Sequence, residues 1–173
     1  MLTLETWGQG LDNATMKPSD DAVRSWECFQ EVAGLLYREI DVALMAKHGL
    51  TIPDVHILHR LNNVPRQGVR IGALAELLVL APSRVTWQVG RLEYRGLARR
   101  VRSRKDRRIV VVGITRKGQD QLGHALRTYA AIVRRDYLAP LTREQMTALG
   151  DCARRVSDAL KVREELEDLF PDV

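Results

Sequence analysis

The spacing of apolar residues changes from helical to strand-like within residues 71–114, and this change constrains the fold more than any other feature. Apolar residues recur at helical spacing across 71–78, and a second helical pattern begins near Pro82 after a short turn. That pattern stops around Gly96, and the runs 97–102 and 109–114 are then rich in β-favouring side chains. The sequence therefore predicts two short helices joined by a tight turn and followed by a β-hairpin.

Longer helical stripes flank this segment on both sides. Residues 19–48 carry apolar side chains at alternating steps of three and four, and Gly49 ends the pattern. A short helix is expected from Pro53, and two further helices are expected after Thr115 and after Thr142, which opens a capping-box pattern. The chain is therefore expected to be mainly α with a small β-hairpin, the arrangement of a winged helix-turn-helix with long helices at both ends.

The chain is expected to divide into four segments. Residues 1–18 show no period and are interpreted as a flexible arm. Residues 53–114 are expected to form the winged domain, and residues 19–52 and 115–173 a helical dimerisation region. The two long apolar stripes need a cover, and a second copy of the chain would supply one. The alternative, that the stripes pack on each other within one protomer, stays open.

The positive charge of the chain is concentrated in one window. Residues 84–108 hold ten basic side chains, nearly all arginine, against Glu93 and Asp106, which is a net charge of +8 in a chain whose total is +5. Arginine donates to phosphates and to guanine edges through a planar fork of N–H groups. A solvated charged face would be the simpler explanation, but the scarcity of opposing charges favours double-stranded DNA as the partner.

The helix expected from Pro82 has two different faces. At about 100° per residue, the side expected to face the protein core consists of Val85, Val89, Leu92 and Gly96. The other face and the hairpin tip carry basic, amide, hydroxyl and aromatic side chains, which suit contacts with bases and phosphates. The predicted DNA-binding residues are Ser83, Arg84, Thr86, Trp87, Gln88, Arg91, Arg95, Arg104, Lys105, Arg107 and Arg108.

The hairpin tip is a second basic element. Its four basic side chains lie where a wing would reach a flanking minor groove, whose negative potential attracts arginine. Asp106 lies among them and would repel DNA. Its predicted role is to accept a hydrogen bond from Arg108 and to orient that side chain.

Several motifs resemble those of the multiple antibiotic resistance regulator (MarR) family. They are Leu74-Ala75-Glu76, Pro82-Ser83-Arg84-Val85-Thr86, Arg91-Leu92-Glu93-Tyr94-Arg95-Gly96-Leu97, Arg100, Asp106-Arg107-Arg108 and Ile114-Thr115-Arg116-Lys117-Gly118. The resemblance spans roughly residues 22–168. It implies an obligate homodimer with interlocked terminal helices, which regulates transcription, in most members as a repressor. A two-fold dimer is expected to bind a pseudo-palindrome with half-sites about one helical turn apart.

The family resemblance also implies a signal, because members change their DNA affinity on binding a small molecule or on thiol oxidation. Family ligands are often phenolic and usually lie between the winged domain and the dimer helices. Candidate ligand-binding residues, although packing or surface exposure explains each of them more simply, are Trp26, Tyr37, Arg38, His56 and His59. The two histidines have the spacing of a metal pair, but no cysteine or carboxylate completes a site, so no metal is expected.

Cys28 lies near the place in the first long helix where a peroxide-sensing branch of the family has its reactive cysteine. That branch holds the thiol with tyrosines, whereas this chain has Val32 and Val42 at about those places. Cys28 is therefore expected to be a buried structural residue, with redox sensing as the alternative. Cys152 is expected to lie in the core on the last helix.

Other functional classes leave marks that this chain lacks. Gly113–Gly118 has the spacing of a phosphate loop, but Gln119 follows where lysine is required. No nucleophile motif, metalloprotease motif or pair of carboxylates occurs, so neither enzyme activity nor a cofactor is expected. A nonspecific architectural DNA-binding protein stays open as an alternative. Two cysteines, no long apolar run and no signal-peptide pattern favour a cytoplasmic protein.

Overall fold

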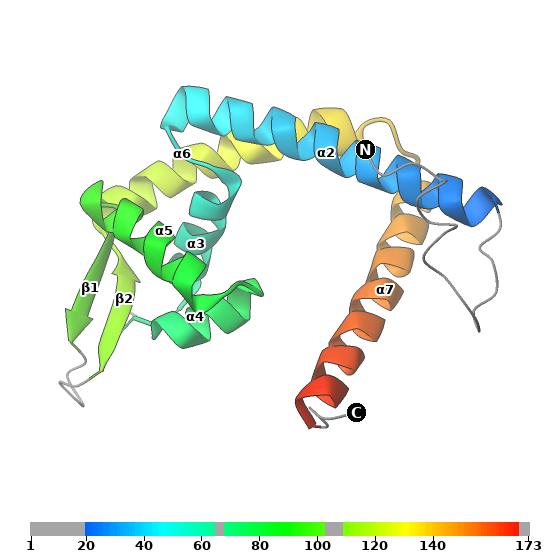
Figure 1. Cartoon of the computed structure of the whole chain (residues 1–173). Coiled ribbons are helices and arrows are strands. Elements are labelled where there is room, and N and C mark those ends of the chain that lie inside the picture. The colour runs from blue at the N-terminus through cyan, green and yellow to red at the C-terminus, as the bar shows by residue number, and fades with distance from the viewer. Residues whose placement is uncertain (1–19, 65–67, 103–108, 170–173) are drawn as a thin grey trace. The chain divides into compact units, whose positions relative to one another are not determined.

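The computed structural model describes residues 20–64, 68–102 and 109–169 of the chain. Its elements, in chain order, are α2 (Asp20–His48), α3 (Ile52–Asn63), α4 (Ile71–Leu78), α5 (Pro82–Tyr94), β1 (Ala98–Arg102), β2 (Val110–Ile114), α6 (Arg116–Ile132), a π-helical stretch (Val133–Leu138) and α7 (Arg143–Leu169). Figure 1 shows α3, α4 and α5 grouped beside the two-stranded hairpin. The expected fold, mainly helical with a small β-hairpin, is confirmed.

The chain divides into two compact units, Met1–Tyr129 and Ala130–Val173. The first unit contains α2 to α5, the hairpin and most of α6, and the second contains the end of α6, the π-helical stretch and α7. The candidate site lies in the first unit.

Side chains fix the junction between α2 and α3. Gly49 ends α2 in a left-handed conformation (φ +60°), which glycine adopts without steric cost. Thr51 and Asp54 then form a capping box: the Asp54 N–H donates to the Thr51 hydroxyl at 3.3 Å, and the Thr51 N–H donates to the Asp54 carboxylate at 3.0 Å. The Ile52 N–H donates to the carboxylate of Asp41 on α2 at 2.7 Å. The first turn of α3 is thereby held against α2.

Helices α4 and α5 form the predicted helix-turn-helix. The turn after α4 contains Val79, whose N–H donates to the Glu76 carbonyl at 3.1 Å. Val79 adopts a left-handed conformation (φ 53°), which is uncommon for a β-branched residue. Helix α5 begins at Pro82, and Ala81 before it provides no side-chain cap.

The predicted wing is an antiparallel pair in which Ala98 faces Ile114 and Arg102 faces Val110. Val69 adds an isolated bridge to Val112, with N–H to carbonyl distances of 2.9 and 2.8 Å in the two directions. This bridge ties the segment before α4 to the hairpin. The helix-turn-helix and the hairpin are therefore parts of one packed structure.

The core of the first unit takes side chains from each helix and from the hairpin. Its fully buried members include Leu44, Leu50, Leu58, Leu74, Val85, Leu92, Leu97 and Val112. Burying a side chain of this size contributes about 1.5–3 kcal/mol. The hydrophobic core therefore sets where α5 lies against α3, α4 and β1.

The start of α6 lies against the backbone that follows α5. The Thr115 hydroxyl donates to the Gly96 carbonyl at 2.7 Å and accepts from the Gly118 N–H at 3.0 Å, so Thr115 caps the helix that was expected to begin after it. A Cβ on Gly118 would collide with the Leu97 carbonyl oxygen, so this close approach requires glycine. The ammonium of Lys117 donates to the Arg95 carbonyl at 2.9 Å.

The second unit begins at Ala130, near the end of α6, and consists mainly of α7. Thr142 and Gln145 form the expected capping box at the start of α7, with hydrogen bonds of 2.9 and 3.2 Å. Within the described residues, no helix combines the length and the apolar character needed to cross a lipid bilayer.

Neither cysteine has the predicted environment. Cys28 on α2 and Cys152 on α7 are both exposed, so the expectation that they are buried was wrong. The reason is that the apolar stripes on these two helices are themselves open: Phe29 and Val156 are 60% and 61% exposed.

Candidate nucleic-acid interface

Helix α5 has the two faces that its periodicity predicts. Val85, Val89 and Leu92 are completely buried, as expected for the core face. Gly96, which was predicted to share that face, lies beyond the end of the helix and is exposed. On the opposite side, Trp87 and Tyr94 are 62% and 94% exposed. The other exposed residues of this helix are Pro82, Ser83, Arg84 and Thr86. The exposed face is therefore available to a large partner.

Gln88 does not belong to that exposed face. The structure leaves it 5% exposed, and its side-chain oxygen is buried without a described hydrogen-bond partner. Val85 and Leu92 lie three residues before and four residues after Gln88 and share its face of the helix. The prediction that Gln88 is exposed was wrong because it lies nearer to the core face than its polarity suggests.

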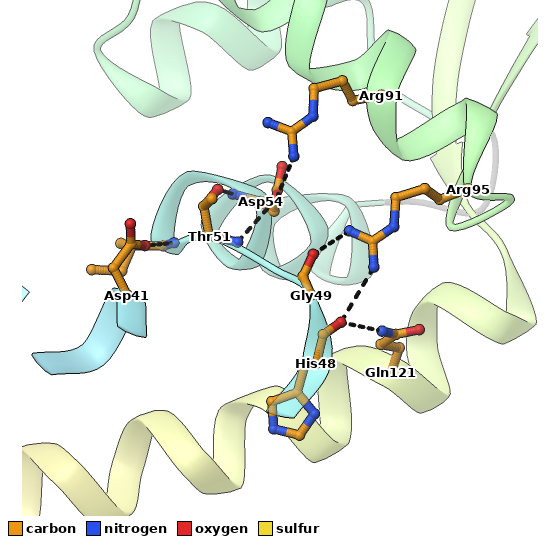
Figure 2. A network of polar contacts seen from close by, with 9 residues as sticks. Asp41, His48, Gly49, Thr51, Asp54, Arg91, Arg95 and Gln121 are labelled. Atoms are coloured by element: carbon orange, nitrogen blue, oxygen red, sulfur yellow. Dashed lines mark hydrogen bonds and ion pairs between the residues drawn. The ribbon is translucent and has the colours of Figure 1, made fainter. Parts of the chain in front are cut away.

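Arg95 is committed to internal contacts. Helix α5 ends at Tyr94, and the Arg95 guanidinium donates to the carbonyls of Gly49 and His48 at 2.5 and 3.2 Å. The side-chain amide of Gln121 on α6 donates to the same His48 carbonyl at 2.7 Å. Figure 2 shows Arg95 reaching from the end of α5 to the α2–α3 junction. Arg95 therefore attaches the end of α5 to this junction, instead of lying on the exposed face as predicted.

Arg91 lies between the junction and the exposed face. Its guanidinium is 3.7 Å from the carboxylate of Asp54, which is completely buried (Figure 2). The same guanidinium lies over the Trp87 ring at 5.0 Å, within the range of a cation–π contact. The three side chains form a series, Asp54–Arg91–Trp87, that runs from the start of α3 to the exposed face of α5.

Sequence reasoning missed Asp54. One oxygen of its carboxylate accepts the Thr51 N–H in the cap of α3 and also attracts Arg91. The second oxygen is buried with no described partner. A threonine followed three residues later by an acid, just before an apolar run, is a capping-box pattern. That spacing would have identified the cap, but nothing in the sequence indicates that Arg91 lies beside it.

A second ion pair connects α5 to β1. The Arg100 guanidinium lies 3.5 Å from the carboxylate of Glu93 and donates to the Thr86 carbonyl at 3.1 Å. The Arg100 backbone N–H also donates to Glu93 at 3.0 Å. These contacts give Glu93 and Arg100, two residues of the motifs that resemble the family, a structural role.

The basic window therefore contains arginines of two kinds. Arg91, Arg95 and Arg100 hold α5 to its neighbours. Arg84, Arg99 and Arg102 are exposed, and no carboxylate in the described part of the chain pairs with them. The predicted wing residues Arg104, Lys105, Arg107 and Arg108, and the orienting residue Asp106, lie outside the described residues.

Two of the predicted ligand-binding residues lie close to Tyr129 of α6. The rings of His56 and Tyr129 are 6.3 Å apart. Partial burial, followed by the charges of His59 and Arg60, lowers the pKa of His56. Burial and then the nearby Tyr37 raise the pKa of Tyr129. The structure thus brings together Tyr37, His56 and Tyr129, although Tyr129 was not predicted as a ligand residue.

The other predicted ligand residues have local surroundings. Trp26 stacks on Phe29 at 5.7 Å, His59 lies 3.2 Å from the Asn63 amide, and Arg38 is exposed. A cavity of about 450 Å³ lies elsewhere in the first unit, and its lining residues are His48, Lys117, Asp120, Gln121 and His124. None of the five predicted ligand residues lines it. Among the described residues, no group of three or more suitable side chains could hold a metal ion.

His48 connects this cavity to the α2–α3 junction. Its ring nitrogen Nε2 lies 2.8 Å from the hydroxyl of Thr128 on α6. Burial and then the neighbouring charges of His124, Lys47 and Arg127 lower the pKa of His48. Its neutral form is therefore favoured in the folded chain.

The buried and exposed faces of α5, the tight turn before it and the hairpin after it define a winged helix-turn-helix DNA-binding protein. Residues 50–110 match the family model described as MarR family. Over 121 residues the chain is 29% identical to the HTH-type transcriptional repressor MdtR of Bacillus subtilis (strain 168), a match that covers 70% of this chain and 76% of that protein.

Two solved structures from Streptomyces coelicolor are similar to the chain at 27% identity. AbsC, a MarR family transcriptional regulator, gives a TM-score of 0.78 over 85% of this chain and 99% of its own. Sco3205, a MarR family transcriptional regulator in complex with DNA, gives a TM-score of 0.80 over 86% of this chain and 93% of its own. The chain is therefore similar to MarR family transcriptional regulators over most of its length, and its residues 50–110 match the model of that family. The similar proteins are transcriptional regulators, and one of them is in complex with DNA.

Proposed function

We propose that this regulator represses transcription in the cytoplasm by binding a pseudo-palindromic operator as a homodimer. The observation that carries the proposal is the two-sided helix α5, which is anchored in the core on one face and presents Arg84, Trp87 and Tyr94 on the other. The similarity to a regulator in complex with DNA supports DNA binding. The similarity to a protein named as a transcriptional repressor supports repression.

The homodimer is supported by apolar faces that each unit leaves open. In the first unit, Phe29, Val32 and Val42 of α2 are all more than half exposed. In the second unit, Val156 and Leu160 of α7 are exposed to a similar degree. We assign residues 19–52 and 115–173 to dimerisation and 53–114 to DNA binding, with 1–18 as an N-terminal arm.

Release from DNA by a small aromatic or phenolic ligand is part of the proposal. The cluster of Tyr37, His56 and Tyr129 joins α2, α3 and α6, and its rings offer both stacking surfaces and hydrogen-bonding groups. A ligand there would contact the helices on both sides of the α2–α3 junction, to which Arg91 and Arg95 attach α5. A thermal-shift screen of phenolic compounds tests this, and a Tyr129→Phe variant should respond less strongly.

Oxidation of Cys28 is a second candidate signal, because this thiol is exposed on α2. If peroxide weakens DNA binding by the wild-type protein but not by a Cys28→Ser variant, thiol oxidation replaces the ligand in this account. Equal responses of the two proteins would exclude it.

Selection of DNA from a random pool tests the proposed function. The protein should enrich sequences with two inverted half-sites about one helical turn apart. Enrichment of a single, unrepeated site would contradict a two-fold dimer on DNA. Recovery of no common sequence would favour the nonspecific architectural alternative.

A further inference from the structure

The interior of α5 contains a glycine, Gly90, that the described fold does not require. Glycine destabilises a helix interior relative to alanine, because its backbone loses more conformational freedom on folding. No described atom outside the adjoining backbone lies within 4 Å of the position that a Cβ on Gly90 would take. The conformation of Gly90 is helical, so neither packing nor a left-handed backbone explains the residue.

Gly90 is partly exposed and lies on the same side of α5 as two exposed aromatic residues. It follows Trp87 by three residues and precedes Tyr94 by four, and these spacings place the three residues on one face of a helix. That face is opposite the buried side chains of Val85 and Leu92. Gly90 therefore forms a notch between two large exposed aromatic side chains, where the helix backbone itself is accessible.

One wall of this notch is held in place before any partner binds. The Trp87 ring lies under the Arg91 guanidinium, and Arg91 is attracted to the buried Asp54 carboxylate. Moving Arg91 away would leave Asp54 as a buried charge with no described cation beside it, which is costly. The contact with Arg91 thus favours a position of the Trp87 ring beside Gly90 in the free protein.

We propose that Gly90 is the point at which the backbone of α5 comes closest to DNA in the major groove, with Trp87 and Tyr94 contacting the bases or sugars on either side. This inference rests on the proposed function. Exposed Arg84 on the same helix and exposed Arg99 on β1 supply positive charge for the flanking phosphates. Glycine permits the close approach, and an apolar ring suits contact with a thymine methyl group.

The variant Gly90→Ala separates this role from a structural one. The added methyl group fits the free protein and improves the helix, so the melting temperature should rise by about 2–4 °C. The same methyl group would hold α5 away from the bases, so affinity for an operator selected with the wild-type protein should fall about tenfold or more. Both are measured on the full chain, by thermal denaturation and by fluorescence anisotropy.

Gly123→Ala is the matched control. Gly123 lies inside α6 and also has no described atom within 4 Å of its Cβ position. This variant should gain a similar thermal shift and keep the wild-type affinity. An equal loss of affinity in both variants would show that the effect is not local to α5, and the inference would be overturned.

Two further outcomes would also overturn it. One is Gly90→Ala with unchanged affinity, and the other is Gly90→Ala with a lower melting temperature, because the fold itself would then require the glycine. In both cases the wild-type protein would still bind its operator, and the proposed function would stand. If the wild-type protein selects no operator at all, the proposed function fails first.

Discussion

Two arginines on the same short segment illustrate how residues of one type divide between binding and structure. Arg84 is exposed on the first turn of α5, and no described carboxylate neutralises it. Arg95 follows the last residue of α5 and donates to two backbone carbonyls of the α2–α3 junction. The charge of Arg84 is free for a phosphate, whereas the charge of Arg95 satisfies oxygen atoms of the protein itself.

The variants Arg84→Ala and Arg95→Ala should therefore fail in different ways. Arg84→Ala should weaken DNA binding, reduce its salt dependence by about one phosphate contact and leave the melting temperature unchanged. Arg95→Ala should lower the free energy of unfolding by about 1–3 kcal/mol, because the carbonyls lose a charged donor. Anisotropy titrations at several salt concentrations and urea denaturation measure the two effects. An Arg84→Ala variant with normal affinity and salt dependence would remove this residue from the interface.

The residue predictions that failed also have physical causes. Gln88 was predicted to face DNA from its polarity, but a helical face includes residues three and four apart, and two of its neighbours on that face are core residues. The requirement for glycine at position 118 was not predicted, because the close backbone approach that causes it joins segments distant in sequence. Local spacing in the sequence contains no information about such contacts.

At the scale of elements, the bounds of the helices follow from local signals. α4 occupies the predicted residues, Ile71–Leu78, and α5 begins at the predicted Pro82. Capping boxes, glycines and prolines act within a few residues, so the sequence alone indicates these ends. The ion pairs that connect elements, such as Asp54 with Arg91, depend on how α3 packs against α5 and could not be predicted.

The variant Asp54→Asn tests the connection between α3 and α5. Asparagine keeps an oxygen for the cap of α3 but removes the charge that attracts Arg91. We expect the free energy of unfolding to fall by about 1–2 kcal/mol, since Arg91 is partly exposed and its loss is screened by solvent. DNA affinity should also fall, because Arg91 and Trp87 lose their fixed positions.

Asp151→Asn provides the control for this prediction. Asp151 forms an exposed ion pair with Arg154 on α7 and should contribute little to stability. If Asp54→Asn is as stable as Asp151→Asn in urea denaturation, the connection has no energetic importance.

The contact between α2 and α6 through His48 should make stability depend on pH. The pKa of His48 in the folded chain lies below its ordinary value of 6.5, so the unfolded chain binds this proton more readily. His56, whose pKa is also lowered, acts in the same direction. The stability that these two neutral histidines contribute to the folded chain is therefore fully present above pH 6.5, and it is lost as the pH falls below that value.

Melting temperatures measured between about pH 5 and pH 7 test this dependence. The melting temperature of the wild-type protein should rise across this interval, and a His48→Gln variant should show a flatter rise. A wild-type melting temperature that falls as the pH increases would contradict the sign of the effect.

At the scale of the whole molecule, the open apolar faces of α2 and α7 predict a dimer. Light scattering should give twice the mass of one chain at micromolar concentration. Val32→Glu places a charge on the open face of α2 and should yield monomers, because desolvating an unpaired carboxylate opposes association. Glu31→Gln, on the neighbouring exposed position, should remain dimeric. A wild-type monomer would contradict the proposed assembly.

The charge of the whole chain has meaning only through its distribution. The total of +5 is modest, but residues 84–108 carry +8 and the remainder is slightly acidic. A dimer would thus present two basic DNA-binding regions on a mildly acidic body. This arrangement favours a bound orientation in which α5 and the hairpin face the duplex.

The central claim is that this protein recognises a particular DNA sequence through α5. The most direct test is the ratio of two dissociation constants, measured by fluorescence anisotropy at physiological salt, for a selected palindrome and for a scrambled duplex of the same composition. We expect a preference of about 10³ or more for the palindrome. A ratio near one would show that the arginines bind any duplex through its phosphates, and the claim of sequence-specific regulation would be wrong.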